Sequence, residues 1–162
     1  MGTKSNVLVG TATLYIRYPV GGAYVDVGFT EDGVRMEYTA AKLAIRVEEK
    51  TYPLTQVIDT EDLKVIANLA EATLQNIYLA IAGSAKVGNV LTIGAGADKE
   101  MSVKIIGKNP AGFNRTIEIP VAVASGTVGV AFRKKEKTIV PVTFEAMESP
   151  AGSLFTITDS TS

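Results

Sequence analysis

The sequence predicts a mainly β domain, and three observations carry that prediction. Valine, isoleucine and threonine recur in short runs along the chain, and these residues favour strands. Several runs alternate apolar with polar residues, which is the period of a half-buried strand. Glycine and proline separate the runs, as turns between strands require. At 162 residues the chain is expected to form one domain, residues 1–162, with a core of its own.

The first third of the chain is expected to hold four short strands. Residues 6–18 form the first, and the sequence PVGG after it ends the strand. Residues 24–29 form the second, and EDG at 31–33 is a turn because Asp-Gly tolerates positive φ. Two alternating segments follow, and their apolar positions are Val34, Met36 and Tyr38, then Leu43, Ile45 and Val47.

The next segment, EEKTYPLTQVID at residues 48–59, is charged at its start and interrupted by Pro53. It is expected to be a long hairpin or an exposed excursion, because it exceeds the length of an ordinary hairpin connection. The sequence DTED at 59–62 clusters three carboxylates. It lacks the glycine and the distant glutamate of a calcium-binding hand, so a solvated turn is expected there.

Residues 63–83, LKVIANLAEATLQNIYLAIAG, fit two patterns. Apolar residues at 63, 65, 67 and 69 alternate as in a strand, whereas those at 63, 66, 70, 74, 77 and 81 have helical spacing. The segment is therefore either a strand that leads into a helix or one continuous helix from Thr60. Asp59 and Thr60 suit a helix N-terminus and support the second alternative.

The rest of the chain is predicted to be strands and loops. Pro120 and Pro141 fall inside two of the strands, so each is expected at a sheet edge or a bulge. The sequences GKNPAGFN and SPAG are loops. The expected strands are residues 90–93, 101–106, 115–123, 128–132, 138–145 and 154–158.

The composition argues against an enzyme. The chain has no cysteine and no histidine, which removes thiolate and imidazole ligands, cysteine nucleophiles and the commonest general base. A net charge of −1 provides no field for gripping nucleic acid or an acidic membrane. No signal peptide or membrane span is expected, and zero cysteine fits a reducing cytoplasm or a particle assembled there. We expect no catalytic residue, no cofactor and no metal.

Two segments have both a functional and a structural interpretation. GAGADK at 94–99 superficially matches a phosphate-binding loop, but it lacks the full glycine spacing and no helix follows, so a turn is expected. FRKKEK at 132–137 is the most basic segment. It is expected to be a hairpin tip, and the alternative is a contact for phosphate or for an acidic neighbouring subunit.

Four segments, taken together, resemble the major tail proteins, or tail tube proteins, of long-tailed bacteriophages. They are NVLVGTATLYI at 6–16, DVGFTEDGVRMEY at 26–38, the segment 63–83, and VPVTFEAMESPAGSLFTITD at 140–159. They cover most of the chain in the order expected of that family. The resemblance implies a β-sandwich or barrel-like tail tube fold with one flanking helix and a long inter-ring loop.

The resemblance also favours a strand that leads into a helix. The strand is expected at about residues 62–69 and the helix at about 72–82. An apolar stripe at positions 74, 77, 78 and 81 faces the sheets in this interpretation, and Gly83 caps the helix. A helix of about three turns needs such packing to persist.

The resemblance implies a structural virion protein that polymerises as stacked hexameric rings into the phage tail tube, the conduit for DNA ejection. Its location is the virion, after assembly in the host cytoplasm. Its partners are copies of itself, the tape measure, terminator and baseplate or tip proteins, and double-stranded DNA that passes through without specific binding. The alternatives are the inner tube of a contractile tail or injection device, and a non-assembling β-sandwich module that binds carbohydrate or protein.

Two sets of residues carry the expected function: the inter-ring loop candidates and the lumen-facing candidates. The mixed charge of the lumen-facing set departs from the acidic interior of many family members. The inter-ring loop candidates are Glu49, Lys50, Thr51, Tyr52, Pro53 and Leu54. The lumen-facing candidates, read as the polar faces of three strands, are Arg35, Glu37, Lys42, Arg46, Glu48, Asp62, Lys64 and Asn68.

Overall fold

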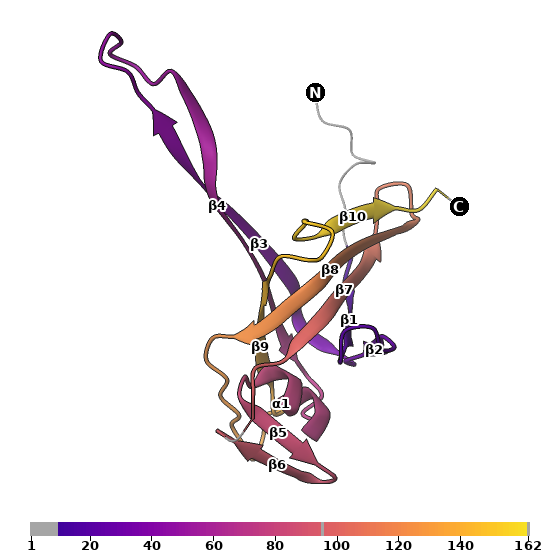
Figure 1. Cartoon of the computed structure of the whole chain (residues 1–162). Helices are drawn as coiled ribbons and strands as arrows, with labels where there is room; N and C mark the ends of the chain where they lie inside the picture. Colours follow the sequence, from indigo (N-terminus) through magenta and orange to yellow (C-terminus); the bar gives the residue numbers. More distant parts are fainter. Residues whose placement is uncertain (1–9, 95, 162) are drawn as a thin grey trace.

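The computed structural model describes residues 10–94 and 96–161 and is mainly β, with 53% of residues in strands and 5% in helix. Figure 1 shows a curled sheet, a long hairpin that leaves it at one end, and a helix and a small hairpin at the other. The predicted fold class is confirmed. The elements are β1 (Thr13–Arg17), β2 (Val25–Asp26), β3 (Thr30–Ile45), β4 (Thr55–Leu69), α1 (Leu74–Ala80), β5 (Ser84–Val87), β6 (Val90–Ile93), β7 (Glu100–Lys108), β8 (Asn114–Ser125), β9 (Val140–Ala146) and β10 (Thr156–Asp159).

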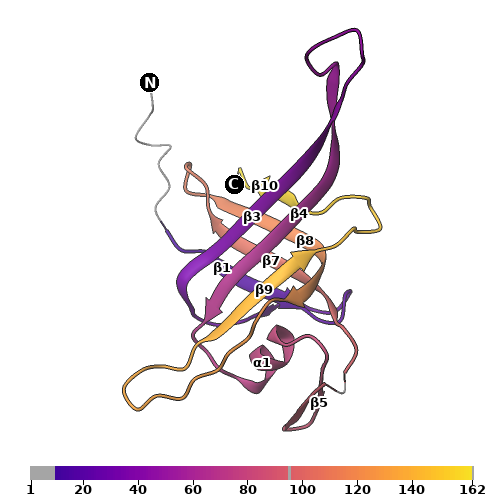
Figure 2. The same ribbon diagram turned by 90° about the vertical axis from the view of Figure 1, so that its left-hand side faces the viewer.

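The main sheet is antiparallel, in the order β2-β1-β7-β8-β9-β4-β3. β10 is an additional strand that pairs with β8 over residues 115–118, while β9 pairs with β8 over residues 122–125. The sheet curls until β3 lies near β1, which makes the body barrel-like (Figure 2). β5 and β6 form a separate two-stranded sheet.

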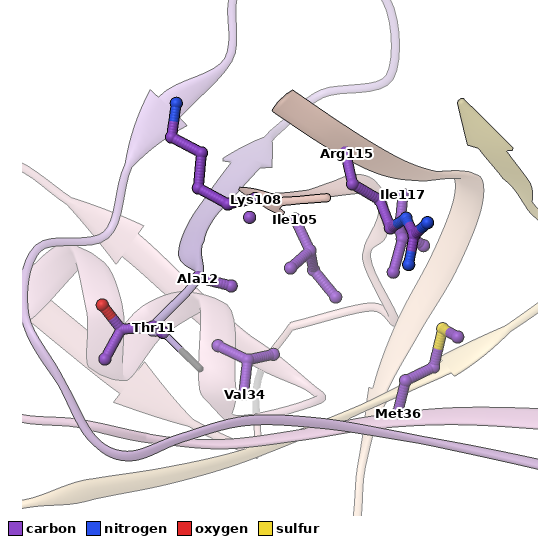
Figure 3. Close-up of a pocket in the computed structure, with 10 residues that line it drawn as sticks. Thr11, Ala12, Val34, Met36, Ile105, Lys108, Arg115 and Ile117 are labelled. Atoms are coloured by element: carbon purple, nitrogen blue, oxygen red, sulfur yellow. The ribbon is translucent and has the colours of Figure 1, made fainter. Parts of the chain in front are cut away.

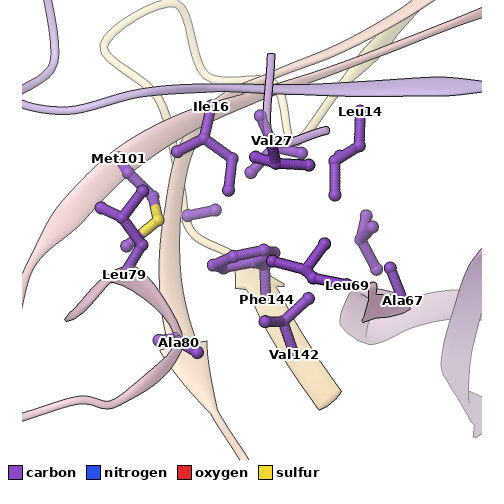
Figure 4. Close-up of a cluster of buried hydrophobic side chains, with 14 of the residues drawn as sticks. Leu14, Ile16, Val27, Ala67, Leu69, Leu79, Ala80, Met101, Val142 and Phe144 are labelled. Atoms are coloured by element: carbon purple, nitrogen blue, oxygen red, sulfur yellow. The ribbon is translucent and has the colours of Figure 1, made fainter. Parts of the chain in front are cut away.

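The core fills the inside of this curl. On β4 the residues at 63, 65, 67 and 69 are buried, as their alternation predicted. Phe144 lies at the centre of the cluster in Figure 4, and its side chain is fully buried. The largest fully buried apolar side chains come from β1, β4, β7, β8 and β9, and they are Leu14, Leu63, Val65, Leu69, Met101, Val103, Ile119, Val140, Val142 and Phe144.

The β3–β4 hairpin replaces several of the predicted short elements. Its strands pair from Thr30 opposite Leu69 to Ile45 opposite Thr55, with register shifts between Glu31 and Val34 and between Ala41 and Lys42. The predicted turn at 31–33 is instead a bulge within β3, where Asp32 and Gly33 have φ of 60° and 75°. The predicted turn at 59–62 is wrong, because β4 runs through it. Glu61 and Asp62 pair with β3 in extended backbone, and Asp59 is left unpaired at a register shift within β4.

The helix follows β4, so the alternative of one continuous helix from Thr60 is wrong. The helix spans seven residues, and the Oγ1 of its N-cap, Thr73, accepts a hydrogen bond from the Asn76 amide at 3.2 Å. The predicted apolar stripe is wrong in part, because the buried positions are Asn76, Leu79 and Ala80. Asn76 is buried because its Nδ2 donates to the Val27 carbonyl at 2.9 Å.

The two proline predictions are confirmed. Pro120 lies at a bulge of β8, opposite the register shift between Met101 and Val103 of β7. Pro141 pairs with Asn68 of β4, in the part of β9 that extends beyond its pairing with β8. A donor is not needed there, since that side of the strand is an edge.

Three other predicted elements change. Residues 128–132 are not a strand but part of a long loop, in which Arg133 and Glu136 form an isolated bridge. β5 was not predicted, and it pairs with β6 across a two-residue turn at Gly88-Asn89. β1 begins at Thr13, and residues 6–9 of the predicted first strand lie outside the described residues.

Lys99 fastens the β5–β6 hairpin to the end of the helix. Its side chain is buried, and Nζ donates to the Ile81 carbonyl at 2.9 Å, the Ser84 carbonyl at 3.2 Å and the Ser84 Oγ at 2.9 Å. The ammonium also lies 4.5 Å from the centre of the Tyr78 ring. Burial lowers the pKa of Lys99, and the nearby Asp98 carboxylate partly offsets this shift.

We expect Lys99→Met to lower the free energy of unfolding by about 1–3 kcal/mol, because the carbonyls of Ile81 and Ser84 lose their donor while staying buried. Urea denaturation measures the change. Lys86→Met, in the same hairpin, is the matched control and is expected to stay within about 0.5 kcal/mol of the wild-type chain. Equal loss in both variants would show that these hydrogen bonds do not anchor the hairpin.

Candidate subunit interface

The outer half of the β3–β4 hairpin extends away from the body of the molecule (Figures 1 and 2). The sequence predicted core-facing apolar positions here, but the structure exposes them. Leu43 is 57% exposed, although it pairs directly with Val57. The exposed large apolar residues of this region, including the connection between the strands, are Leu43, Ile45, Tyr52, Leu54, Val57 and Ile58.

An exposed hairpin of this kind indicates an interaction surface. A two-stranded hairpin alone in water is only marginally stable. A contiguous apolar patch on a soluble chain commonly marks a surface that another molecule covers. These two facts together make the outer half of β3–β4 the strongest candidate interface among the described residues.

The six inter-ring loop candidates lie at the end of this hairpin. Residues 46–54, called here the hairpin tip, connect β3 to β4, and the Leu54 amide donates to the Ile45 carbonyl at 2.8 Å. Tyr52 and Leu54 are both more than half exposed. The ammonium of Lys50 lies 5.8 Å from the centre of the Tyr52 ring. The structure places these candidates together, and whether they reach another ring stays a prediction.

Five of the lumen-facing candidates lie along one stretch of the sheet. Asp62, Lys64 and Asn68 alternate with the buried residues of β4, so they point away from the core. Arg35 and Glu37 of β3 lie on the same outer face, because Glu37 pairs directly with Lys64. The cations have acidic partners, since Arg35 lies 3.2 Å from Glu37 and Lys64 lies 3.2 Å from Glu145 of β9.

The other three lumen-facing candidates do not share that face. β3 is continuous from Val34 to Ile45, and the residue left unpaired at the register shift between Ala41 and Lys42 is Asp59 of β4. Lys42 therefore has the parity of Met36 and Tyr38 and points to the opposite side from Arg35. Arg46 and Glu48 lie in the hairpin tip. The sequence predicted two strands side by side at residues 34–39 and 42–48, whereas these residues are successive parts of one strand and its connection.

Two further exposed segments lie at the end of the molecule opposite the β3–β4 hairpin, on either side of α1 (Figure 2). They are residues 126–139, called here the basic loop, and the β5–β6 hairpin. Phe132 in the basic loop is 87% exposed, and Val87 at the end of β5 is 81% exposed. The sequence indicated the charges of the basic loop but not the exposure of its aromatic ring.

An apolar cavity of about 180 Å³ opens where β3 approaches the start of β1 (Figure 3). Val34, Met36, Ile105 and Ile117 form its walls. Lys108 and Arg115 are its charged lining residues, and Figure 3 shows no carboxylate among the labelled side chains.

Several charged side chains, to which the sequence assigned no role, hold neighbouring segments against the sheet. The ring of Tyr24 lies 4.6 Å from the Arg17 guanidinium and 4.0 Å from the Lys104 ammonium, and its hydroxyl donates to Glu118 at 2.7 Å. Burial raises the pKa of Tyr24 to about 12, and Glu118 adds to the shift. These contacts hold the segment between β1 and β2 against the outer face of the sheet.

Arg115 fastens β10 in a similar way. Its guanidinium donates two hydrogen bonds to Asp159, at 2.6 and 2.7 Å. These hydrogen bonds lower the pKa of the Asp159 carboxyl. The pair lies beside the register where β10 joins β8, so Arg115 is engaged in holding a strand rather than open to a ligand.

Within residues 10–94 and 96–161 there is no cluster of three or more carboxylate, cysteine or histidine side chains that could hold a metal ion. No helix in the same part of the chain is long and apolar enough to cross a membrane. The GAGADK segment contains no helix in its described residues, as the sequence analysis expected.

No family model matches the chain, and no curated protein sequence matches it. Solved structures do match. A chain from the tail of an empty GTA particle with C6 symmetry aligns with a TM-score of 0.50 and 7% identity, over 90% of this chain and 94% of that one. A chain from the virion of the native gene transfer agent (GTA) particle aligns with a TM-score of 0.52 and 8% identity, over 90% and 95%.

A chain from the baseplate of the anti-feeding prophage (AFP), a 6-fold symmetrised structure, has a TM-score of 0.49 and 10% identity over 99% and 94%. The two GTA matches cover nearly the whole of both chains. They define the class of fold: this chain has the fold of a protein in a phage-type tail particle. At 7–8% identity the likeness establishes the fold alone.

Proposed function

We propose that this protein is a structural subunit of a phage tail tube. Copies associate side by side as hexameric rings, and the rings stack into a hollow conduit for DNA ejection. The fold shared with GTA tail and virion chains supports this class of function. The observation that carries the proposal is the β3–β4 hairpin, whose outer half exposes large apolar side chains and extends away from the other described elements.

The assembly follows from the type of contact that the molecule offers. The exposed hairpin and the basic loop lie at opposite ends, so a contact between them is head-to-tail and would repeat from one ring to the next. The long edge of β3 also offers backbone groups to a neighbouring chain.

The proposed location is the tail of a virion assembled in the host cytoplasm. The proposed partners are further copies of this chain, tape measure, terminator and baseplate or tip proteins, and DNA in transit. The chain acts by assembly and has no enzymatic role. The inner tube of a contractile tail or injection device is the second candidate, supported by the same fold; a sheath protein in the same particle would distinguish it.

We assign the lumen to the outer face that carries Arg35, Glu37, Asp62 and Lys64. Its ion pairs neutralise cations that would otherwise bind phosphates and slow the passage of DNA. The residues of opposite parity, including Lys42, then face away from the channel. A density map of the assembled tube tests this assignment, which is wrong if these four side chains lie on the outside.

The experiment that tests the proposed function is negative-stain electron microscopy of the purified chain over a range of concentrations. We expect rings or tubes with a central channel. Size-exclusion chromatography with light scattering on the same samples gives the mass of the smallest closed assembly, expected to be six subunits. A chain that remains monomeric at high concentration would exclude tube assembly and favour the non-assembling binding module.

A further inference from the structure

We propose that the basic loop, residues 126–139, is the surface that receives the hairpin tip of a second copy of this chain. This proposal rests on the tail tube function and adds the place where successive copies meet. It also assigns a role to the most basic segment of the sequence, residues 132–137, which the fold itself does not explain.

The two surfaces lie where a head-to-tail contact needs them. In both views of the molecule the hairpin tip lies at one end, and the basic loop and the β5–β6 hairpin lie at the other (Figures 1 and 2). They are therefore too widely separated to cover each other within one chain. A translated copy would bring one against the other, and the contact would repeat with each further copy.

Both surfaces expose apolar side chains. On the hairpin tip, Tyr52 is 63% exposed and Leu54 is 55% exposed. On the basic loop Phe132 is 87% exposed. Phe132 projects from a loop without packing into the core, so covering its ring would remove more apolar area from water than any other single residue here.

The two surfaces carry groups of opposite charge. Residues 132–137 carry four cations and one carboxylate, a net charge of +3. The hairpin tip, residues 46–54, carries two cations and two carboxylates, and its carboxylates are adjacent, at Glu48 and Glu49. A basic group that faces this acidic pair would favour one orientation of the contact.

The pairing inside the basic loop leaves two cations for the partner. Arg133 lies 2.8 Å from Glu136, and Lys137 lies 3.2 Å from Glu31 at the start of β3. Lys134 and Lys135 have no acidic partner within the described part of the chain. The adjacent glutamates of the hairpin tip, Glu48 and Glu49, are the natural counterparts in a neighbouring copy.

A protein partner fits this surface better than DNA. Duplex DNA would use the cations for its phosphates but would leave the Phe132 ring in water, because its bases are stacked inside. A conduit must also release DNA, and a protruding basic contact to phosphate would retain it. The combination of an exposed aromatic ring with two adjacent lysines therefore points to a second copy of the chain.

A charge swap tests the proposal. The double variant Lys134→Glu/Lys135→Glu is expected to raise the concentration needed for tube formation at least about tenfold, and Glu48→Lys/Glu49→Lys is expected to do the same. The chain that carries all four substitutions has the wild-type net charge and is expected to assemble within about threefold of the wild-type concentration. Turbidity and electron microscopy measure assembly, and circular dichroism confirms that each variant is folded.

The outcomes separate this proposal from the proposed function. Wild-type chains that never form tubes would overturn both. Normal assembly of both double variants, or failure of the fourfold variant to recover while remaining folded, would overturn the contact and leave the tail tube function standing. Loss of duplex DNA binding in Lys134→Glu/Lys135→Glu with assembly unchanged would assign the loop to DNA instead.

Chemical cross-linking gives a second measurement, for which a chain without cysteine is well suited. A chain with Glu49→Cys and Phe132→Cys is treated with a bismaleimide after assembly. We expect a ladder of covalent multimers, because the two thiols of one chain lie at opposite ends and can react only between copies. Each single-cysteine variant is the control and should give no ladder. Assembled tubes without a ladder would overturn the contact.

Discussion

Replacing the hairpin tip, residues 46–54, by Asn-Gly is expected to give a folded chain that no longer forms tubes. Ile45 and Thr55 already face each other as a strand pair, so a two-residue turn can join them without disturbing the register. The tip contributes no residue to the core, and a shorter connection costs little conformational entropy. We therefore expect the free energy of unfolding to stay within about 1 kcal/mol of the wild-type chain.

The loss of assembly is expected to be complete, because the shortened chain lacks Tyr52, Leu54 and both tip glutamates at once. Electron microscopy and light scattering measure it. Replacing residues 110–112, in the connection between β7 and β8, by Asn-Gly is the control, since it shortens a different exposed connection and keeps the buried Asn109, whose side chain donates to the Ser160 carbonyl. Tubes of normal length from the tip-shortened chain would show that the hairpin tip does not join copies.

Phe144→Ala is expected to lower the free energy of unfolding by about 3–5 kcal/mol, the largest effect of a single substitution that we predict. Its ring is fully buried on β9 at the centre of the core, and its removal leaves a cavity that β4 and β8 cannot close without breaking their pairing. Urea denaturation measures the change, in the tip-shortened chain so that assembly does not contribute to stability.

Phe132→Ala is the matched control for this measurement. It removes the same ring from a side chain that is 87% exposed, so the free energy of unfolding is expected to change by less than about 0.5 kcal/mol. In the full-length chain the same substitution is expected to weaken assembly. Equal destabilisation by the two substitutions would mean that Phe132 packs into the subunit rather than against a neighbour.

The core of the body could be predicted from local pattern. Alternation at residues 63–69 identified the buried side of β4, and the positions of Pro120 and Pro141 correctly indicated a bulge and an edge. The two ends of the molecule could not be predicted in this way. Leu43, Ile45 and Val57 alternate as core residues do, but the body does not extend as far as the hairpin and leaves them in water.

The relative orientation of the lumen-facing candidates also could not be predicted from local pattern. The sequence predicted a polar side for residues 34–39 and another for residues 42–48, but Arg46 and Glu48 lie in the hairpin tip, beyond the end of β3. The relation between the two polar sides depends on whether a turn separates them or one strand continues. β4 pairs with β3 along its whole length, so the strand continues and the two polar sides point in opposite directions.

By itself the sequence determined the class of the fold and most of the strands, because alternation, proline and glycine act over a few neighbouring residues. It also determined the absence of histidine and cysteine chemistry. Only the tertiary structure decided which alternating faces are buried and which are left for another copy. Burial depends on what packs against a strand, and that partner comes from elsewhere in the chain or from a different chain altogether.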